Sequence, residues 1–203
     1  MNPDITYKAL QLFLTPFFSV SYHLRTTGKE NLIQKPVIFA SNHSSYLDPS
    51  IIIYALSKKE PIHFIAAQLK GIGGIYEKLY KQTGQMVLKG KGILALKDFY
   101  EKSQQTLDKG RCLVIFPEGK RNNPRDIGKF NNGASSIAIR TQTPIIPIYI
   151  SGAYDHGNKF PRLFRNIDLR FGKPIEPPES KGRKSVSGLT EKLRNEIIIL
   201  SKS

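Results

Sequence analysis

Cysteine and tryptophan are nearly absent from this chain of 203 residues, which has one cysteine, Cys112, and no tryptophan. A single cysteine cannot form an internal disulfide bond, so a disulfide-stabilised scaffold is excluded. Cys112 lies in the apolar run CLVIF, where a thiol usually acts as a small core side chain. A reducing compartment fits this usage.

The chain also lacks a run of about 20 apolar residues, so it predicts no membrane-spanning helix. The nearest approach is residues 8–24, where Leu and Phe recur at helical spacing around Pro16. This amphipathic helix could lie in a membrane interface or pack on the core of its own domain, and periodicity leaves both interpretations open. The N-terminus has no basic region or cleavage site typical of a secretory signal. We expect an N-terminal interfacial segment, residues 1–24, and one domain, residues 25–203.

Acidic residues are scarce: 16 Asp and Glu face 31 Lys and Arg, which gives a formal net charge of +15. Such an excess indicates a polyanionic partner. Nucleic acid, an anionic membrane surface and phosphorylated substrates all qualify.

Short apolar runs alternate with helical patterns along the chain. Strands are predicted at 36–41, 62–67, 85–88, 112–116, 145–150 and 167–172, and helices at 48–59, 91–109, 132–141 and 185–201. This alternation predicts an α/β fold, a single layered domain with a mostly parallel sheet flanked by helices. Reactive groups in such folds gather at the carboxyl ends of the strands.

The segment SNHSSYLDPS follows the first of these strands and holds His43 and Asp48. A loop histidine can act as a general base near neutral pH, and a nearby carboxylate can fix its tautomer. Asp48 with Pro49 also fits the start of a helix, where Asp48 would be the N-cap. From this stretch alone, a plain N-cap at Asp48 and a plain loop histidine at His43 are the better explanation.

The segment FPEGKR follows the strand at 112–116 and crowds Glu118, Lys120 and Arg121 around Gly119. Gly119 permits a tight turn and lets a ligand approach the backbone. Arg can hold a phosphate through two N–H groups, and Lys as a point charge. Further along, Lys129 begins KFNNGA, which leads into a helix.

The order and spacing of NHSSYLDP, FPEGKR, KFNNGA and IIPIYI resemble the lysophosphatidic acid acyltransferase family, glycerolipid acyltransferases with an HxxxxD motif. The likeness covers roughly residues 25–175. The resemblance implies that His43 is the general base and that Asp48 orients it. An acceptor hydroxyl would then attack an acyl thioester directly, and no GxSxG serine is present.

The resemblance also implies an acceptor-binding turn in which Glu118 and Gly119 shape the loop and Arg121 holds a phosphate. Lys129 matches the next basic position of the family. Lys120 stands where the family commonly has Thr, which leaves the acceptor open. A further family position, usually Arg, falls on Lys89 or the lysine two residues beyond it.

The expected enzyme transfers a fatty acyl group from acyl-carrier protein or coenzyme A to lysophosphatidate, with no cofactor and no metal. It would sit on the cytoplasmic face of a membrane as a peripheral or monotopic protein, and residues 69–80 are a second candidate contact. Another lysophospholipid acceptor is the alternative. A non-catalytic basic module is the rival class, but basic and aromatic residues are not interleaved, so we expect no nucleic-acid partner.

Overall fold

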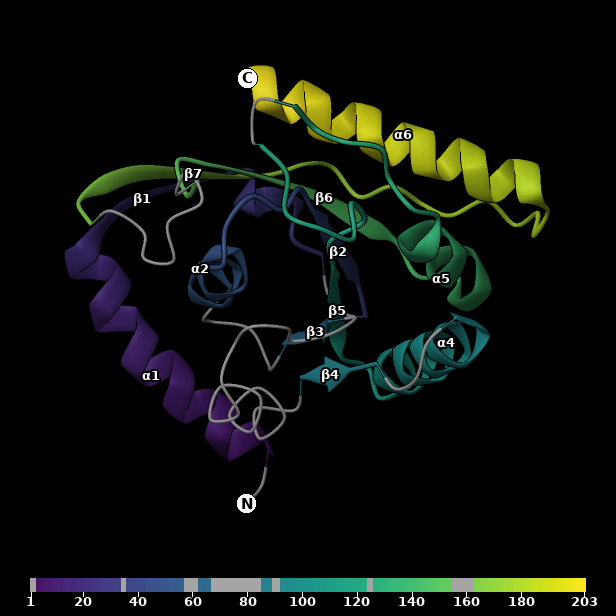
Figure 1. Cartoon of the computed structure of the whole chain (residues 1–203), viewed down its shortest axis with the longest axis horizontal. Helices are drawn as coiled ribbons and strands as arrows, with labels where there is room; N and C mark the ends of the chain where they lie inside the picture. Colours follow the sequence, from purple (N-terminus) through teal and green to yellow (C-terminus); the bar gives the residue numbers. More distant parts are fainter. Residues whose placement is uncertain are drawn as a thin grey trace.

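The structure is a computed structural model that describes residues 3–33, 36–56, 62–66, 85–88, 92–123, 126–154 and 163–203. Its strands are β1 (Tyr22–Thr27), β2 (Ile38–Ser41), β3 (Ile62–Ala66), β4 (Met86–Val87), β5 (Cys112–Ile115), β6 (Ile145–Ser151) and β7 (Arg165–Phe171). Its helices are α1 (Pro3–Ser21), α2 (Asp48–Ala55), α4 (Gly92–Asp108), α5 (Gly133–Thr141) and α6 (Arg183–Lys202), with the 3-10 helix η1 (Lys29–Asn31). Figure 1 shows these elements.

The described strands form one sheet in the order β1-β7-β6-β2-β5-β3-β4. Within the run β6-β2-β5-β3-β4, each strand is parallel to the next. Strand β7 runs antiparallel to β6, and β1 pairs parallel with β7. The predicted α/β fold with a mostly parallel sheet is confirmed.

Helices cover both faces of the sheet (Figure 1). On the face covered by α1 and α2, Phe39 and Val114 join the core; Ile38 and Leu113 point to the other face, covered by α4, α5 and α6. Strands buried on both faces read as continuous apolar runs, which explains why β2 and β5 were visible in the sequence.

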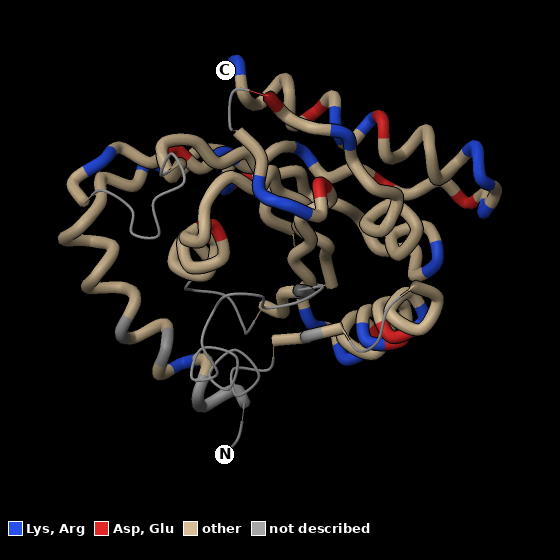
Figure 2. The backbone as a smooth tube through the Cα atoms, viewed as in Figure 1, with Lys and Arg blue, Asp and Glu red and all other residues tan. Residues whose placement is uncertain are grey.

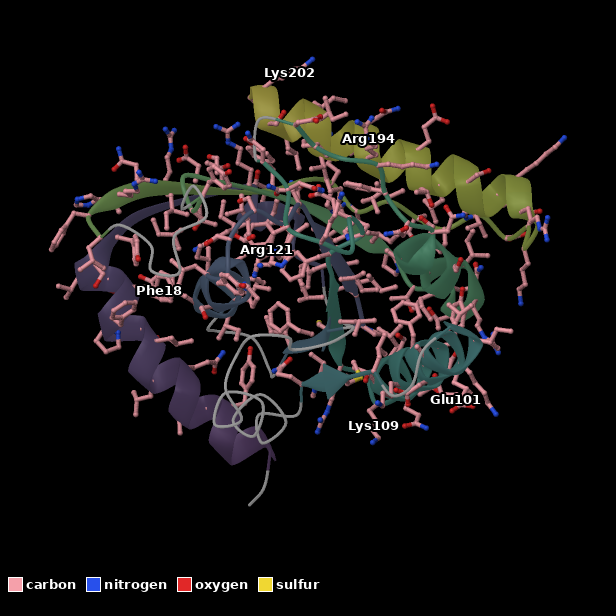
Figure 3. All side chains as sticks on the ribbon, viewed as in Figure 1. Phe18, Glu101, Lys109, Arg121, Arg194 and Lys202 are labelled. Atoms are coloured by element: carbon pink, nitrogen blue, oxygen red, sulfur yellow. The ribbon has the colours of Figure 1, made fainter. Side chains whose placement is uncertain are left out.

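Helix α1 has two apolar sides. Tyr7 and Phe18 are almost fully buried in the core, and Figure 3 shows Phe18 on the side of α1 that faces α2. Burial raises the pKa of the Tyr7 hydroxyl above its usual range, so this side chain stays neutral. On the opposite side Leu12 and Val20 are 78% and 74% exposed. The helix therefore packs on its own core and still presents an apolar face outward.

The helix predicted over 8–24 ends at Ser21, and the residues that follow form β1. Pairing with β7 explains the change, because Tyr22 lies opposite Arg165 and the ladder continues to Thr27. The expected division after residue 24 thus falls inside a strand. No described helix is long and apolar enough to cross a membrane, and residues 69–80 lie outside the described part.

Candidate active site

The two motif loops meet because β2 and β5 are parallel neighbours, with Ala40 opposite Ile115. Both strands end at the same edge of the sheet, so His43 and Glu118 leave that edge together. The backbone N–H of His43 donates to Oε1 of Glu118 at 2.9 Å. In return, the N–H of Asn122 donates to the carbonyl oxygen of His43 at 2.8 Å.

The His43 and Asp48 side chains form the predicted pair, with 2.8 Å between His43 Nδ1 and Asp48 Oδ2. Asp48 is fully buried, whereas the His43 side chain is partly exposed. A carboxylate only accepts, so Nδ1 carries the proton and Nε2 keeps its lone pair. This is the tautomer that a general base requires.

Asp48 does not act as the N-cap that the sequence suggested. It is the first residue of α2, and its Oδ2 accepts from the N–H groups of Ser44 and Ser45 at 2.7 and 2.8 Å. The carboxylate thus turns back into the loop that precedes the helix. One oxygen atom therefore fixes both the histidine ring and the loop that carries it.

The face of the His43 ring stacks on Phe116, with ring centroids 4.2 Å apart and an angle of 20° between the planes. Phe116 is the residue that follows β5, and it also stacks on Phe64 of β3. The imidazole is held at its edge by Asp48 and on its face by Phe116. This leaves little freedom for the ring to rotate, which favours a fixed direction for Nε2.

Glu118 is buried and holds the site loops together. Besides the His43 N–H, its carboxylate accepts from the Asn122 side-chain amide and from the N–H of Gly128 at 3.2 Å. Charge-assisted bonds of this kind are about twice as strong as neutral ones. Its contacts support the shaping role expected for Glu118.

Gly119 adopts a left-handed conformation, with φ of +69°. A Cβ atom here would lie 2.9 Å from Nδ2 of Asn131, whose amide donates to the carbonyl oxygens of Pro117 and Glu118. The turn therefore needs glycine for its backbone and for the close approach of Asn131. The sequence suggested that a ligand approaches the backbone at Gly119. In the structure the group close to Gly119 is the side-chain amide of Asn131.

The basic residues of the site are exposed. The Cζ atom of Arg121 lies 3.3 Å above the centre of the Tyr46 ring, and Figure 3 shows Arg121 beside α2. Lys120 and Lys129 are exposed and form no ion pair within the described residues. Lys89 lies outside the described residues. Figure 2 shows that Lys and Arg elsewhere are spread over several elements.

Two site residues were missed from the sequence. The Asn42 side chain donates to the carbonyl oxygen of Ile150 at 3.0 Å and accepts from its N–H at 2.8 Å, which ties the end of β2 to β6. Tyr46 covers Arg121. An asparagine directly between a strand and His43 was the available signal for the first of these. Tyr46 gave no signal, since an aromatic loop residue has many roles.

Within the described residues, no three His, Cys, Asp or Glu side chains come together as a metal site. His63 is buried in β3, where its Nε2 lies 3.3 Å from Arg111. The groups that the described residues place at this edge of the sheet include a histidine, its carboxylate and the adjacent arginine.

Comparisons with known proteins show the family to which the chain belongs. The family model described as Acyltransferase matches residues 23–151. The probable 1-acyl-sn-glycerol-3-phosphate acyltransferase of Mycoplasma pneumoniae is 30% identical over 188 residues, covering 86% of this chain and 70% of that protein. The Pseudomonas aeruginosa protein named 1-acyl-sn-glycerol-3-phosphate acyltransferase is 26% identical over 185 residues, covering 85% and 66%.

A solved structure shares the fold. The crystal structure of the 1-acyl-sn-glycerophosphate acyltransferase from Thermotoga maritima matches with a TM-score of 0.69 and 22% identity, covering 93% of this chain and 77% of that one. The chain belongs to the acyltransferase family, and within it to the group whose curated members are named 1-acyl-sn-glycerol-3-phosphate acyltransferases. The prediction that the chain is an acyltransferase is confirmed.

Proposed function

We propose that this enzyme transfers a fatty acyl group from a thioester to the free hydroxyl of 1-acyl-glycerol-3-phosphate, which yields phosphatidate for phospholipid synthesis. The observation that carries the proposal is the His43–Asp48 pair, bonded at 2.8 Å, beside a loop that presents Arg121. The names of the relatives support the same acceptor.

The proposed mechanism is direct transfer, without a cofactor. Nε2 of His43 takes the proton from the acceptor hydroxyl while the oxygen attacks the thioester carbonyl. The tetrahedral intermediate collapses, the C–S bond breaks, and the leaving thiolate takes the proton back from the imidazolium. Asp48 stabilises that imidazolium through its bond to Nδ1. Coenzyme A and acyl-carrier protein are the two candidate thiols, and both are anionic partners for a chain of net charge +15.

The test is acyl transfer by purified protein in lipid vesicles, with coenzyme A and carrier-protein thioesters offered in parallel. Lysophosphatidate competes there with other lysophospholipids. Phosphatidate as the main product supports the proposal and identifies the donor. Transfer only to another lysophospholipid would show that lysophosphatidate is not the acceptor. If neither donor supports transfer to any acceptor, the proposal is overturned.

Arg121 is the proposed phosphate ligand, because it is exposed beside the His43 loop and no described residue forms an ion pair with it. Arg121→Ala should raise the KM for lysophosphatidate about 10- to 100-fold, the effect of losing a hydrogen bond to a charged group. The KM for the thioester should change much less. Initial rates with each substrate varied in turn measure both constants.

Arg140 supplies the matched control, since it is an exposed arginine that lies over the Tyr100 ring on the other face of the sheet. Arg140→Ala should leave both KM values unchanged. An Arg121→Ala enzyme with an unaltered acceptor KM would remove Arg121 from phosphate binding.

We also propose that the enzyme binds the cytoplasmic face of a membrane through the outward side of α1. The exposed apolar residues of α1 recur at helical spacing on that side: Ala9, Leu12, Pro16, Phe17 and Val20. Phe164, 71% exposed, lies at the end of the same helix, since its N–H donates to the carbonyl oxygen of Ser21. Net charge of +15 complements the anionic lipids of that leaflet.

Replacing Leu12 and Val20 together by Gln should lower binding to anionic vesicles about 10-fold or more, because two exposed apolar side chains no longer enter the bilayer. Gln keeps helix propensity close to that of Leu. Ile199→Gln is the control, because Ile199 is 59% exposed and belongs to α6, a helix that lies away from α1 (Figure 1). Vesicle cosedimentation measures binding, and equal binding by all three proteins would refute this role of α1.

A further inference from the structure

The Tyr46–Arg121 contact joins the two motif loops through their side chains. Tyr46 is the third residue after His43 and is 45% exposed. Arg121 comes from the loop after β5, and its Cζ atom lies 3.3 Å above the Tyr46 ring. Both side chains reach solvent, so the contact is not a consequence of burial in the core.

The backbones that carry these side chains are fixed against each other. The N–H of Asn122, next to Arg121, donates to the carbonyl oxygen of His43 at 2.8 Å. The N–H of His43 donates to the buried carboxylate of Glu118 at 2.9 Å. The Tyr46 ring therefore holds a defined place relative to the proposed base, and so does a guanidinium stacked on it.

Stacking covers one face of the guanidinium and leaves its N–H groups free, because these donors point outward in the plane. Among the described residues, no hydrogen bond or ion pair uses them. A phosphate can therefore bind Arg121 through two of these N–H groups while the stack persists. The ring restricts the long side chain without competing for its ligand.

We infer that Tyr46 is a positioning residue that holds Arg121 ready for the acceptor phosphate and thereby contributes to acceptor affinity. This inference rests on the proposed function. Without the ring, an exposed arginine loses its side-chain freedom only when the acceptor binds. The preorganisation favours binding of the acceptor alone, because Arg121 is proposed to bind the acceptor phosphate. The thioester takes part in the reaction through its carbonyl group instead.

Three variants test this. Tyr46→Leu should raise the KM for lysophosphatidate about 2- to 5-fold, the ordinary strength of an exposed cation–π contact, with kcat and the thioester KM unchanged. Tyr46→Phe keeps the ring and should behave as the wild type. Tyr100→Leu is the matched control, because Tyr100 lies under Arg140 on the other face of the sheet, and it should leave the acceptor KM unaltered.

A double variant shows whether Tyr46 acts through Arg121. In an Arg121→Ala background, Tyr46→Leu should add no further rise in the acceptor KM, and full additivity would overturn the inference. An unchanged acceptor KM in the single Tyr46→Leu variant would overturn it as well. Failure of the proposed function is distinct, since it would appear as a wild-type enzyme that makes no phosphatidate.

Discussion

Replacing His43 by Ala should lower kcat for acyl transfer by about 10²- to 10⁴-fold, the usual contribution of a positioned general base. The protein should remain folded, because the imidazole is partly exposed and Asp48 keeps the N–H groups of Ser44 and Ser45 as partners. Phosphatidate formation with saturating substrates gives kcat, and thermal unfolding gives the Tm. We expect the Tm to fall by only a few degrees.

His23→Ala is the control for His43→Ala, because His23 is an exposed histidine on β1. It should retain full activity. His43→Gln keeps a polar side chain over Phe116 and should be as inactive as the alanine variant. A folded His43→Ala enzyme that keeps a tenth or more of wild-type activity would refute the proposed mechanism.

Asp48→Asn should lower kcat nearly as far, and it should also reduce stability. In the native enzyme Oδ2 takes all three hydrogen bonds, while Oδ1 is buried without a partner among the described residues. An asparagine oxygen can replace Oδ2, but its NH₂ group then occupies the unpartnered position. An unsatisfied buried donor costs about 1–3 kcal/mol, and the neutral amide no longer stabilises the imidazolium.

The two variants therefore separate catalysis from folding. Asp48→Asn should lose activity and show a lower denaturant midpoint, whereas His43→Ala should lose activity at a nearly unchanged midpoint. Urea unfolding followed by circular dichroism measures the difference. Wild-type kcat in Asp48→Asn would show that the carboxylate charge has no part in the reaction.

The sequence was most informative where the relevant contacts are local or where a strand is buried on both faces. His43 and Asp48 are five residues apart, so their pairing was predictable from one loop. Strands β2 and β5 read as apolar runs because both faces of each are covered. Their parallel alignment then placed the two motif loops at one edge.

Long-range contacts were not predictable in the same way. The bond from His43 to Glu118 joins residues 75 apart, and the Asn42 bridge to Ile150 spans 108. Such contacts depend on which strands become neighbours, which no local pattern records. Strand β1 was missed because it lies at the edge of the sheet and its burial alternates, so it shows no apolar run. Its first residues were absorbed into the preceding helical pattern.

The double role of α1 has a consequence for attempts to obtain a water-soluble enzyme. Deleting the helix would remove Tyr7 and Phe18 from the core, and Ser19 would no longer meet the Tyr54 hydroxyl of α2 at 3.0 Å. Loss of one large buried aromatic side chain alone costs about 3–5 kcal/mol, a large part of the about 5–15 kcal/mol that keeps a domain folded. Solubility must instead come from replacing the outward residues of α1 one by one, with the inward ones kept.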